Sequence, residues 1–344
     1  MAVSSLKTNM SDVTGPRTLI GWHGVRFTLP PDWNLMTYSL DPSEGYLKVD
    51  SPDNSMFVQV KWSRPSAKPA RSLAGMTMNF IRKYATKPVV DTSVPDLKQI
   101  LDNFLKSAEK KTRKTKTSFD CKIKPRSEEA NGIRVGHPFS WSGGGYGQGK
   151  IWHCKECGKV VIAQVVGQNR DEVGKVAAAL LSDFHDHSEG GWDVWALYDL
   201  VASIPSDYRL ANQRLHFGQL RLEFDKPGGD RIILDRWGLA DVLKKRVPIE
   251  EWFYNTYDLK RSKVQKTEMQ VQGHSAYRVK RKIREPLDLL RIYKDAGLSM
   301  RPALYYDACC WECEDTNKIY AIQVWHNRTV QGLLDSVAER CECH

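Results

Sequence analysis

The sequence predicts an α+β protein of two similar repeats, each an antiparallel β-sheet flanked by helices. Three observations predict this fold class: stretches of alternating apolar and polar residues, helical stripes that follow them, and landmarks that recur in the same order in both halves of the chain. We expect the first repeat at residues 1–188 and the second at 189–344, joined near the sequence DHSEGGWD.

Strands are predicted wherever side chains alternate with a period of two. GVRFTLP at 24–30 alternates in this way, and GYLKVDS at 45–51, SMFVQVKW at 55–62 and GKVVIAQVVG at 158–167 do so less strictly. The sequences PDNS and KPGGD are typical of turns between paired strands. Each half is therefore expected to contain an antiparallel meander.

Helices are expected at 72–84 and 239–257, and further helices open at Arg170 and Arg328. The segment DEVGKVAAALLSDF carries an apolar stripe with helical spacing, made of Val173, Val176, Ala177, Leu180, Leu181 and Phe184. The segment TVQGLLDSVAER repeats the stripe with Val330, Leu333, Leu334 and Val337. Helices at these places would cover the faces of the two sheets.

The two halves share landmarks in the same order. PPDWNL at 30–35 matches PSDYRL at 205–210, and VQVKW at 58–62 matches ILDRW at 233–237. A Gly-His pair follows in each half, and then a Cys-x-x-Cys beside a Trp. The recurrence indicates a duplicated domain, with a longer basic insert at 106–126 in the first copy.

In each half, a strand ending in LPPDWNL or its counterpart, a meander ending in a Trp, a central helix, a Gly-His strand, a hairpin and a C-terminal helix together resemble the PsbP-like fold. Members of that fold include photosystem accessory proteins and a Ran-binding nuclear import factor. The resemblance implies an α-β-α domain whose role is mostly non-enzymatic binding. Tandem copies with Cys-x-x-Cys depart from the usual pattern, so no partner is carried over.

The chain has 344 residues, a formal net charge of +10 and eight cysteines. No apolar run approaches the length needed to cross a bilayer, and the N-terminus lacks the apolar segment of a secretory signal, so we expect a cytoplasmic protein with no membrane role. In that setting Cys-x-x-Cys favours metal or redox chemistry over a framework of disulfides.

The paired Cys-x-x-Cys motifs, Cys154/Cys157 and Cys310/Cys313, are the strongest chemical signal in the sequence. Two thiolates at this spacing can occupy adjacent vertices of a zinc tetrahedron. Two such pairs complete a closed structural site. The sequence therefore predicts a structural zinc ion that is shared by the four cysteines and holds the two repeats together.

Each repeat could instead bind its own metal with ligands from its last helix. The sequence CECH offers Cys341, Cys343 and His344, and DFHDH offers His185 and His187. The cysteines could also stay reduced and free of metal, or they could form a thiol-redox pair. A redox pair is disfavoured because reactive cysteines at this spacing lie at a helix N-terminus, whereas a strand follows Cys157.

Basic residues gather in two segments that occupy roughly matching places in the two halves. The first group is Lys110, Lys111, Arg113, Lys114 and Lys116, and the second is Lys280, Arg281 and Lys282. A basic element that recurs at one fold position favours a polyanion partner. The alternative is a solvated basic loop.

Together these features predict a non-catalytic, zinc-stabilised binding protein whose basic face contacts RNA or a ribonucleoprotein such as the ribosome. A protein–protein adaptor without a nucleic-acid role is one alternative, and a metal-dependent hydrolase is another. No Ser-His-Asp order, H-E-x-x-H motif or spaced carboxylate pair stands out, and no small-molecule substrate is identified.

Overall fold

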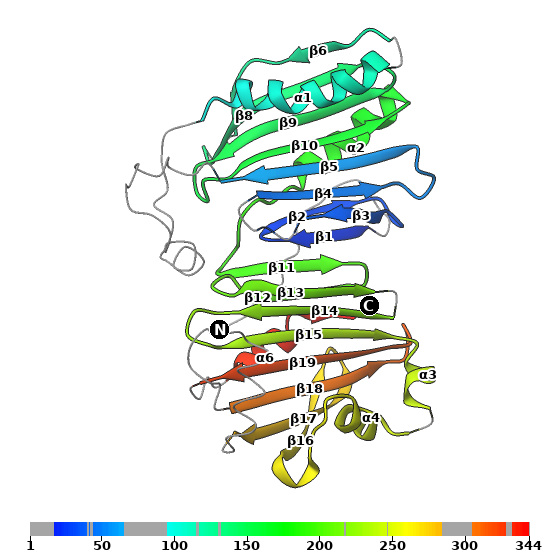
Figure 1. Ribbon diagram of the computed structural model, residues 1–344, viewed down its shortest axis with the longest axis vertical. Coiled ribbons are helices and arrows are strands. Elements are labelled where there is room, and N and C mark those ends of the chain that lie inside the picture. The colour runs from blue at the N-terminus through cyan, green and yellow to red at the C-terminus, as the bar shows by residue number, and fades with distance from the viewer. Residues whose placement is uncertain are drawn as a thin grey trace, which may run out of the picture.

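The computed structural model describes residues 17–39, 41, 44–64, 95–114, 117–129, 132–216, 218–245, 247–283, 305–327 and 332–343. Within these ranges three antiparallel sheets follow one another along the long axis of the molecule (Figure 1). None of the helices in these ranges is long and apolar enough to span a membrane. The helix expected at 72–84 lies outside the described residues.

Two large sheets contain most of the strands, and their strand orders correspond one to one. The first large sheet runs β3 (Asn34–Tyr38), β4 (Glu44–Asp50), β5 (Met56–Ser63), β10 (Val160–Gly167), β9 (Tyr146–Cys154), β8 (Arg134–Ser142) and β6 (Asp120–Ile123), with β7 (Ser127–Glu128) paired to β8. The second large sheet runs β13 (Arg209–His216), β14 (Gln219–Asp225), β15 (Arg231–Gly238), β19 (Lys318–His326), β18 (Tyr305–Cys313), β17 (His274–Lys282) and β16 (Gln265–Val271).

A central sheet combines strands from both halves of the chain. Its order is β2 (Val25–Leu29), β1 (Thr18–Trp22), β11 (Trp192–Leu197), β12 (Leu200–Pro205) and β20 (Cys341–Glu342). Gly21 of β1 pairs with Ala196 of β11. These two residues also correspond when PPDWNL is aligned with PSDYRL, so the halves meet through equivalent strands.

Helices cover limited parts of the sheets. Their bounds are α1 (Leu97–Lys114), α2 (Arg170–Ser182), α3 (Ala240–Lys244), α4 (Ile249–Thr256), the 3₁₀ turn η2 (Arg261–Lys263) and α6 (Leu333–Ala338). The α2 helix begins at Asn169, whose side chain accepts hydrogen bonds from the backbone N–H groups of Asp171 and Glu172. It packs against β9, β10 and β2, as the apolar stripe of its sequence predicts.

The main hydrophobic core is continuous across both halves. It joins residues of all three sheets and includes the buried indoles of Trp22, Trp62, Trp152, Trp195 and Trp311. The rings of Trp22 and Trp195, one from each half, meet edge to face with centroids 5.0 Å apart. Two smaller cores lie against the opposite faces of the large sheets, beneath α1 and beneath α4.

The prediction of an α+β fold of two helix-flanked sheets is wrong, because the molecule is mostly antiparallel β and contains three sheets. The helix expected at 239–257 is broken into α3 and α4, since Pro248 stands between them and lacks the backbone N–H of a helix interior. Within the described part of the stripe at 329–340, residues 332–340, the helix is α6.

Candidate metal centre

The first candidate site is built on the hairpin between β9 and β10. Cys154 ends β9, and a tight turn returns the chain: the N–H of Gly158 donates to the carbonyl of Cys154 at 2.9 Å, and the N–H of Cys154 donates to the carbonyl of Lys159 at 2.9 Å. Gly158 adopts a φ of 69°, a conformation that glycine allows without strain. The turn thereby brings Cys157 back beside Cys154.

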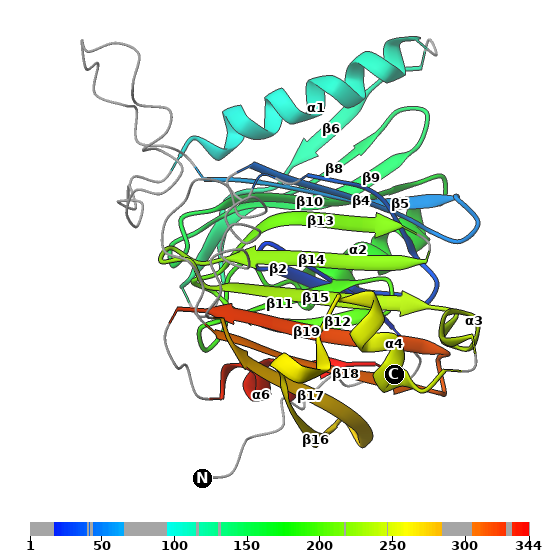
Figure 2. The same cartoon turned by 60° about the horizontal axis from the view of Figure 1, so that its bottom comes forward.

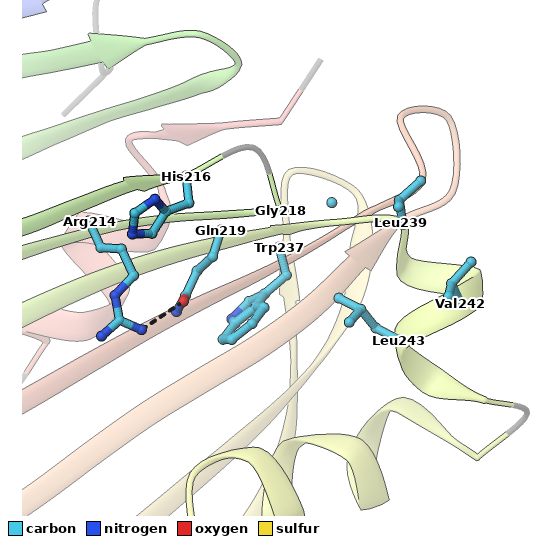
Figure 3. Close-up of a pocket in the computed structure, with 9 residues that line it drawn as sticks. Arg214, His216, Gly218, Gln219, Trp237, Leu239, Val242 and Leu243 are labelled. Carbon is cyan, nitrogen blue, oxygen red and sulfur yellow. Dashed lines mark hydrogen bonds between the residues drawn. The ribbon is translucent and has the colours of Figure 1, made fainter.

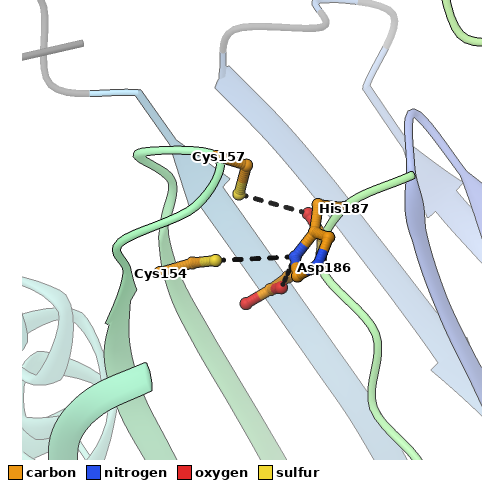
Figure 4. Close-up of side chains that lie close together, drawn as sticks. All are labelled: Cys154, Cys157, Asp186 and His187. Atoms are coloured by element: carbon orange, nitrogen blue, oxygen red, sulfur yellow. Dashed lines mark hydrogen bonds and ion pairs between the residues drawn. The ribbon is translucent and has the colours of Figure 1, made fainter. Parts of the chain in front are cut away.

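The chain segment after α2 supplies the other side of the site (Figure 4). The Nδ1 atom of His187 lies 3.5 Å from Sγ of Cys154, and the thiol of Cys157 donates to the backbone carbonyl of Asp186 at 3.6 Å. Ligand atoms of Cys154, Cys157, Asp186 and His187 all lie within 4.8 Å of one another. These four residues could hold a metal ion, and we call them the first cluster.

The distances of the first cluster suit a tetrahedral ion. Zn–S and Zn–N bonds of about 2.3 and 2.05 Å at a tetrahedral angle put sulfur and nitrogen about 3.6 Å apart. The observed separation of Cys154 Sγ and His187 Nδ1 is 3.5 Å. Nδ1 of His187 is also 2.7 Å from Oδ1 of Asp186, a hydrogen-bond distance. A metal bound at this nitrogen would displace the proton of that bond.

Asp186 is the buried anchor of the cluster. Its side chain is fully buried and accepts hydrogen bonds from Nε1 of Trp152 at 2.6 Å and Nε of Arg134 at 3.1 Å. Burial would raise the pKa of Asp186, but the charge of Arg134 and these hydrogen bonds hold it below its ordinary value. The carboxylate therefore stays ionised and fixes the orientation of His187.

The two thiols of the first cluster differ in acidity. A hydrogen bond from Cys154 lowers the pKa of Cys157 to about 7 against the effect of burial, and the ammonium of Lys159 assists. The same hydrogen bond and burial raise the pKa of Cys154. The backbone N–H of Lys159 further lowers the pKa of Cys157. One thiolate is thus available near neutral pH, which metal binding requires.

The structure does not bring the four predicted zinc cysteines together. Cys310 and Cys313 lie within one continuous strand, β18, where residues three apart point to opposite faces. Cys310 is buried in the core beneath α4, whereas Cys313 is buried in the main core. The second Cys-x-x-Cys therefore does not form a metal-binding turn, and the shared four-cysteine site is not present among the described residues.

Strand register shows which cysteine of the second half corresponds to Cys154. Leu47 and Leu222 correspond when PPDWNL is aligned with PSDYRL, and paired strands lead from Leu47 through Val60 to Ala163 and from Leu222 through Leu234 to Ile322. Ala163 therefore corresponds to Ile322 and Val160 to Ile319, and the match of VQVKW with ILDRW is shifted by one residue. Val160 pairs with His153, and Ile319 pairs with Glu312. Cys154 and Cys313 each follow the second member of these pairs, so they are equivalent. Cys310 instead occupies the place of Ile151. The sequence comparison aligned Cys154 with Cys310 because the two motifs have the same spacing. That alignment differs by three residues from the one that the strand register gives.

The remaining predicted ligands are divided between two places. Nδ1 of His185 pairs with Oε1 of Glu189 at 2.6 Å, and His185 is not part of the first cluster. Cys343 lies near Cys313 and His274. Cys341, on β20, is buried and pairs with Ala202 of β12. His344 lies outside the described residues. Sequence reasoning missed Asp186 as a member, although it directly precedes His187.

The predicted basic residues do not form one surface. Lys110 is exposed on α1; Lys111, Arg113 and Lys114 also lie on α1, and Lys116 is outside the described residues. Lys280, Arg281 and Lys282 lie on β17. The helix α1 and the strand β17 are at opposite ends of the molecule in both views (Figures 1 and 2).

The cations of β17 are also engaged by neighbouring side chains. Arg281 lies over the rings of Tyr306 and Trp325 at 5.7 and 6.0 Å, and Lys282 lies 5.7 Å from the ring of Tyr305. Nζ of Lys280 is 3.9 Å from Oδ2 of Asp307. These contacts partly satisfy the positive charge within the protein itself.

A second feature is a groove between α3 and the β13–β15 end of the second large sheet (Figure 3). It has a volume of about 490 Å³. His216, Gln219 and Trp237 stand opposite one another on adjacent strands and form its floor. The apolar side is formed by Leu239, Val242 and Leu243, and the polar end by Arg214.

Comparison with known proteins adds little to this geometry. No family model matches the chain, and no curated protein matches its sequence. Among solved structures it is similar to the apo structure of the immunity protein TplEi of T6SS from Pseudomonas aeruginosa, with 10% sequence identity over 95% of this chain and 97% of that chain, at a TM-score of 0.30. A likeness at this TM-score carries no argument about function. The resemblance to the PsbP-like fold stays a prediction.

Proposed function

We propose that this chain is a non-catalytic protein-binding scaffold, and that a zinc ion at the first cluster stabilises it. The observation that carries the binding role is the groove beside α3, where a solvent-exposed apolar wall faces an arginine. An RNA partner has less support, because the two basic groups are at opposite ends of the molecule. The proposal therefore takes a protein, and not RNA, as the partner.

The exposure and backbone conformation of Leu239 are not explained by a contribution to the stability of the fold. Its side chain is 54% exposed, and the neighbouring Val242 is 59% exposed. Leu239 also adopts a φ of 58°, in the left-handed region that costs a non-glycine residue about 1–3 kcal/mol. An exposed leucine in a strained backbone conformation contributes little to folding, so a role in binding is the better explanation.

The charge of the groove indicates the kind of partner. Arg214 donates from Nη1 to Oε1 of Gln219 at 3.2 Å, and no ion pair of Arg214 occurs in the described ranges. Arg221, on the neighbouring strand, is by contrast neutralised by Asp235 at 2.9 Å. We therefore propose an extended segment of a partner protein, with a bulky apolar side chain against Leu239 and Val242 and a carboxylate at Arg214.

Selection from a displayed peptide library tests this role directly. We expect enrichment of peptides with an acidic residue near a large apolar one. Their affinity should fall at least about tenfold for Leu239→Asn, since Asn tolerates the left-handed conformation and the fold is kept. Met36→Asn is the matched control, because Met36 is 57% exposed but lies on β3.

Three outcomes would overturn the protein-binding role. One is the absence of any enriched peptide, and another is equal binding by Leu239→Asn and wild type. The third is salt-sensitive binding of labelled single-stranded RNA that is lost on charge reversal of Lys110, Lys111, Arg113 and Lys114, because that result supports a nucleic-acid partner.

Zinc is the metal that best fits the first cluster. Two thiolates and an imidazole are the donors of structural zinc sites, and thiolate ligands disfavour magnesium and calcium. Asp186 supports the site from within, because its second oxygen is held by Arg134 and Trp152. The ion would fasten the β9–β10 hairpin to the segment after α2.

Zinc at about 1,000 times its Kd is expected to stabilise the wild-type protein by about 4 kcal/mol. Cys157→Ser should remove the part of this stabilisation that the first cluster contributes, since a serine hydroxyl is not a thiolate ligand. Cys121→Ser is the control, because Cys121 is a free, half-buried cysteine on β6. The measurement is chemical denaturation with and without zinc. Equal stabilisation of both variants would contradict the assignment.

A further inference from the structure

A second group of metal-binding side chains lies in the C-terminal half. His274 begins β17, Cys313 ends β18 and Cys343 directly follows β20. One ligand atom of each lies within 4.8 Å of the others. Cys313 and Cys343 are buried, and His274 is partly buried. Three segments that are distant in the sequence therefore converge on one point, which we call the second cluster.

We infer that His274, Cys313 and Cys343 bind a second soft divalent cation of the zinc class, separate from the ion of the first cluster. Two cysteine sulfurs and an imidazole nitrogen are the donor set of such an ion. A divalent charge would also neutralise two thiolates in a buried place, where isolated charges are costly. This inference does not depend on the groove or on occupation of the first cluster.

The position of the second cluster supports the inference independently of its composition. Cys313 is the register equivalent of Cys154, as shown above. In the first half Arg26 of β2 bridges to His185, and in the second half Val201 of β12 pairs with Glu342. Arg26 and Val201 correspond in the sequence alignment, so His185 corresponds to Glu342. The next residues, Asp186 and Cys343, are therefore equivalent as well.

Strand register also gives the first-half equivalent of His274, the third residue of the second cluster. Arg134 is the first residue of β8, and it pairs with Cys154. His274 is the first residue of β17, the equivalent strand, two residues before Ala276, which pairs with Trp311. The second half thus has histidine in place of Arg134 and cysteine in place of Asp186. An arginine–carboxylate pair is replaced by two metal ligands at the same place in the fold.

The inference explains how the last residues of the described chain are held. β20 is only two residues long and pairs with β12 at the edge of the central sheet. Besides this pairing, the carbonyl of Cys343 accepts from the hydroxyl of Tyr320 at 3.4 Å and from Sγ of Cys313 at 3.9 Å. A cation on Cys313, Cys343 and His274 would fasten this short strand to β17 and β18.

Cobalt titration of the metal-free full-length protein tests the inference, because tetrahedral cobalt–thiolate sites absorb visible light. We expect about two equivalents for the wild type and about one for Cys154→Ser/Cys157→Ser, since the second cluster keeps its ligands. Adding Cys343→Ala to that double variant should remove the remaining signal. Cys310→Ala is the matched control, because Cys310 lies on the same strand but faces the other core.

Several results would overturn the inference. They are no cobalt absorption in Cys154→Ser/Cys157→Ser, an unchanged stoichiometry in Cys343→Ala, or a mass two hydrogens lower that locates a Cys313–Cys343 disulfide in the freshly purified, thiol-blocked protein. If Cys343→Ala does not fold, His274→Gln serves instead, because this side chain is less buried. It should weaken cobalt binding at the second cluster by about 10-fold or more.

Discussion

Asp186→Asn is expected to destabilise the metal-free protein by about 3–5 kcal/mol, because it removes one partner of a buried ion pair. The Asp186 side chain is fully buried, and that of Arg134 is 14% exposed. The amide keeps one neutral acceptor oxygen for Arg134 and Trp152, but the guanidinium of Arg134 loses the negative charge that compensates its burial. Urea denaturation in the presence of a chelator measures the effect, which should appear as a lower midpoint at unchanged slope.

The control for this prediction is Glu128→Gln. Its partner Lys155 is 48% exposed, so this pair lies at the surface and its loss should leave the midpoint close to that of wild type. If the two variants had the same midpoint, the proposed role of Asp186 as the buried anchor of the first cluster would be wrong. The double variant Arg134→Met/Asp186→Leu should recover part of the lost stability, since it removes both charges together.

Gly21→Ala is expected to destabilise the protein by about 3 kcal/mol and to loosen the junction between the halves. A Cβ atom at Gly21 would lie 2.6 Å from the carbonyl oxygen of Val194 and 3.0 Å from the amide nitrogen of Ala196. Both are backbone atoms of β11, so rotation of a side chain cannot relieve the clash. The strands β1 and β11 would have to separate.

Thermal unfolding, followed by limited proteolysis at the 186–193 connection, measures the effect of Gly21→Ala. Gly218→Ala is the matched control, because nothing lies within 4 Å of a Cβ at that position. It should be neutral or slightly stabilising, since alanine reduces the freedom of the unfolded chain. Faster cleavage in Gly21→Ala than in Gly218→Ala is expected, and equal cleavage would contradict the role of the junction.

The local elements were largely predictable from the sequence. The alternating stretches at 24–30, 45–51, 55–62 and 158–167 are confirmed as β2, β4, β5 and β10, because alternation reports directly on a half-buried strand. The stripe that opens at Arg170 is confirmed as α2. The strand β10 is buried along its whole length, which its nearly continuous apolar sequence indicates.

The pairing of distant strands was not predictable in the same way. No local sequence pattern indicates that β1 pairs with β11 of the other half. The central sheet was therefore not predicted, and the predicted fold class was wrong. The predicted set of metal ligands was wrong for a related reason. Cys310 and Cys313 have a metal-binding spacing, but a continuous strand puts them on opposite faces. Asp186 and His274 join the two candidate clusters through tertiary structure, which no spacing in the sequence reports.

The junction of β1 and β11 has a consequence for the origin of the chain. Gly21 and Ala196 occupy equivalent places in the two halves, and they pair with each other in antiparallel fashion. A strand that meets its own equivalent in this way is the arrangement of a two-fold symmetric homodimer. We infer that an ancestor with a single repeat dimerised through this edge before the two copies were fused. Either half expressed alone would expose that edge and is expected to self-associate.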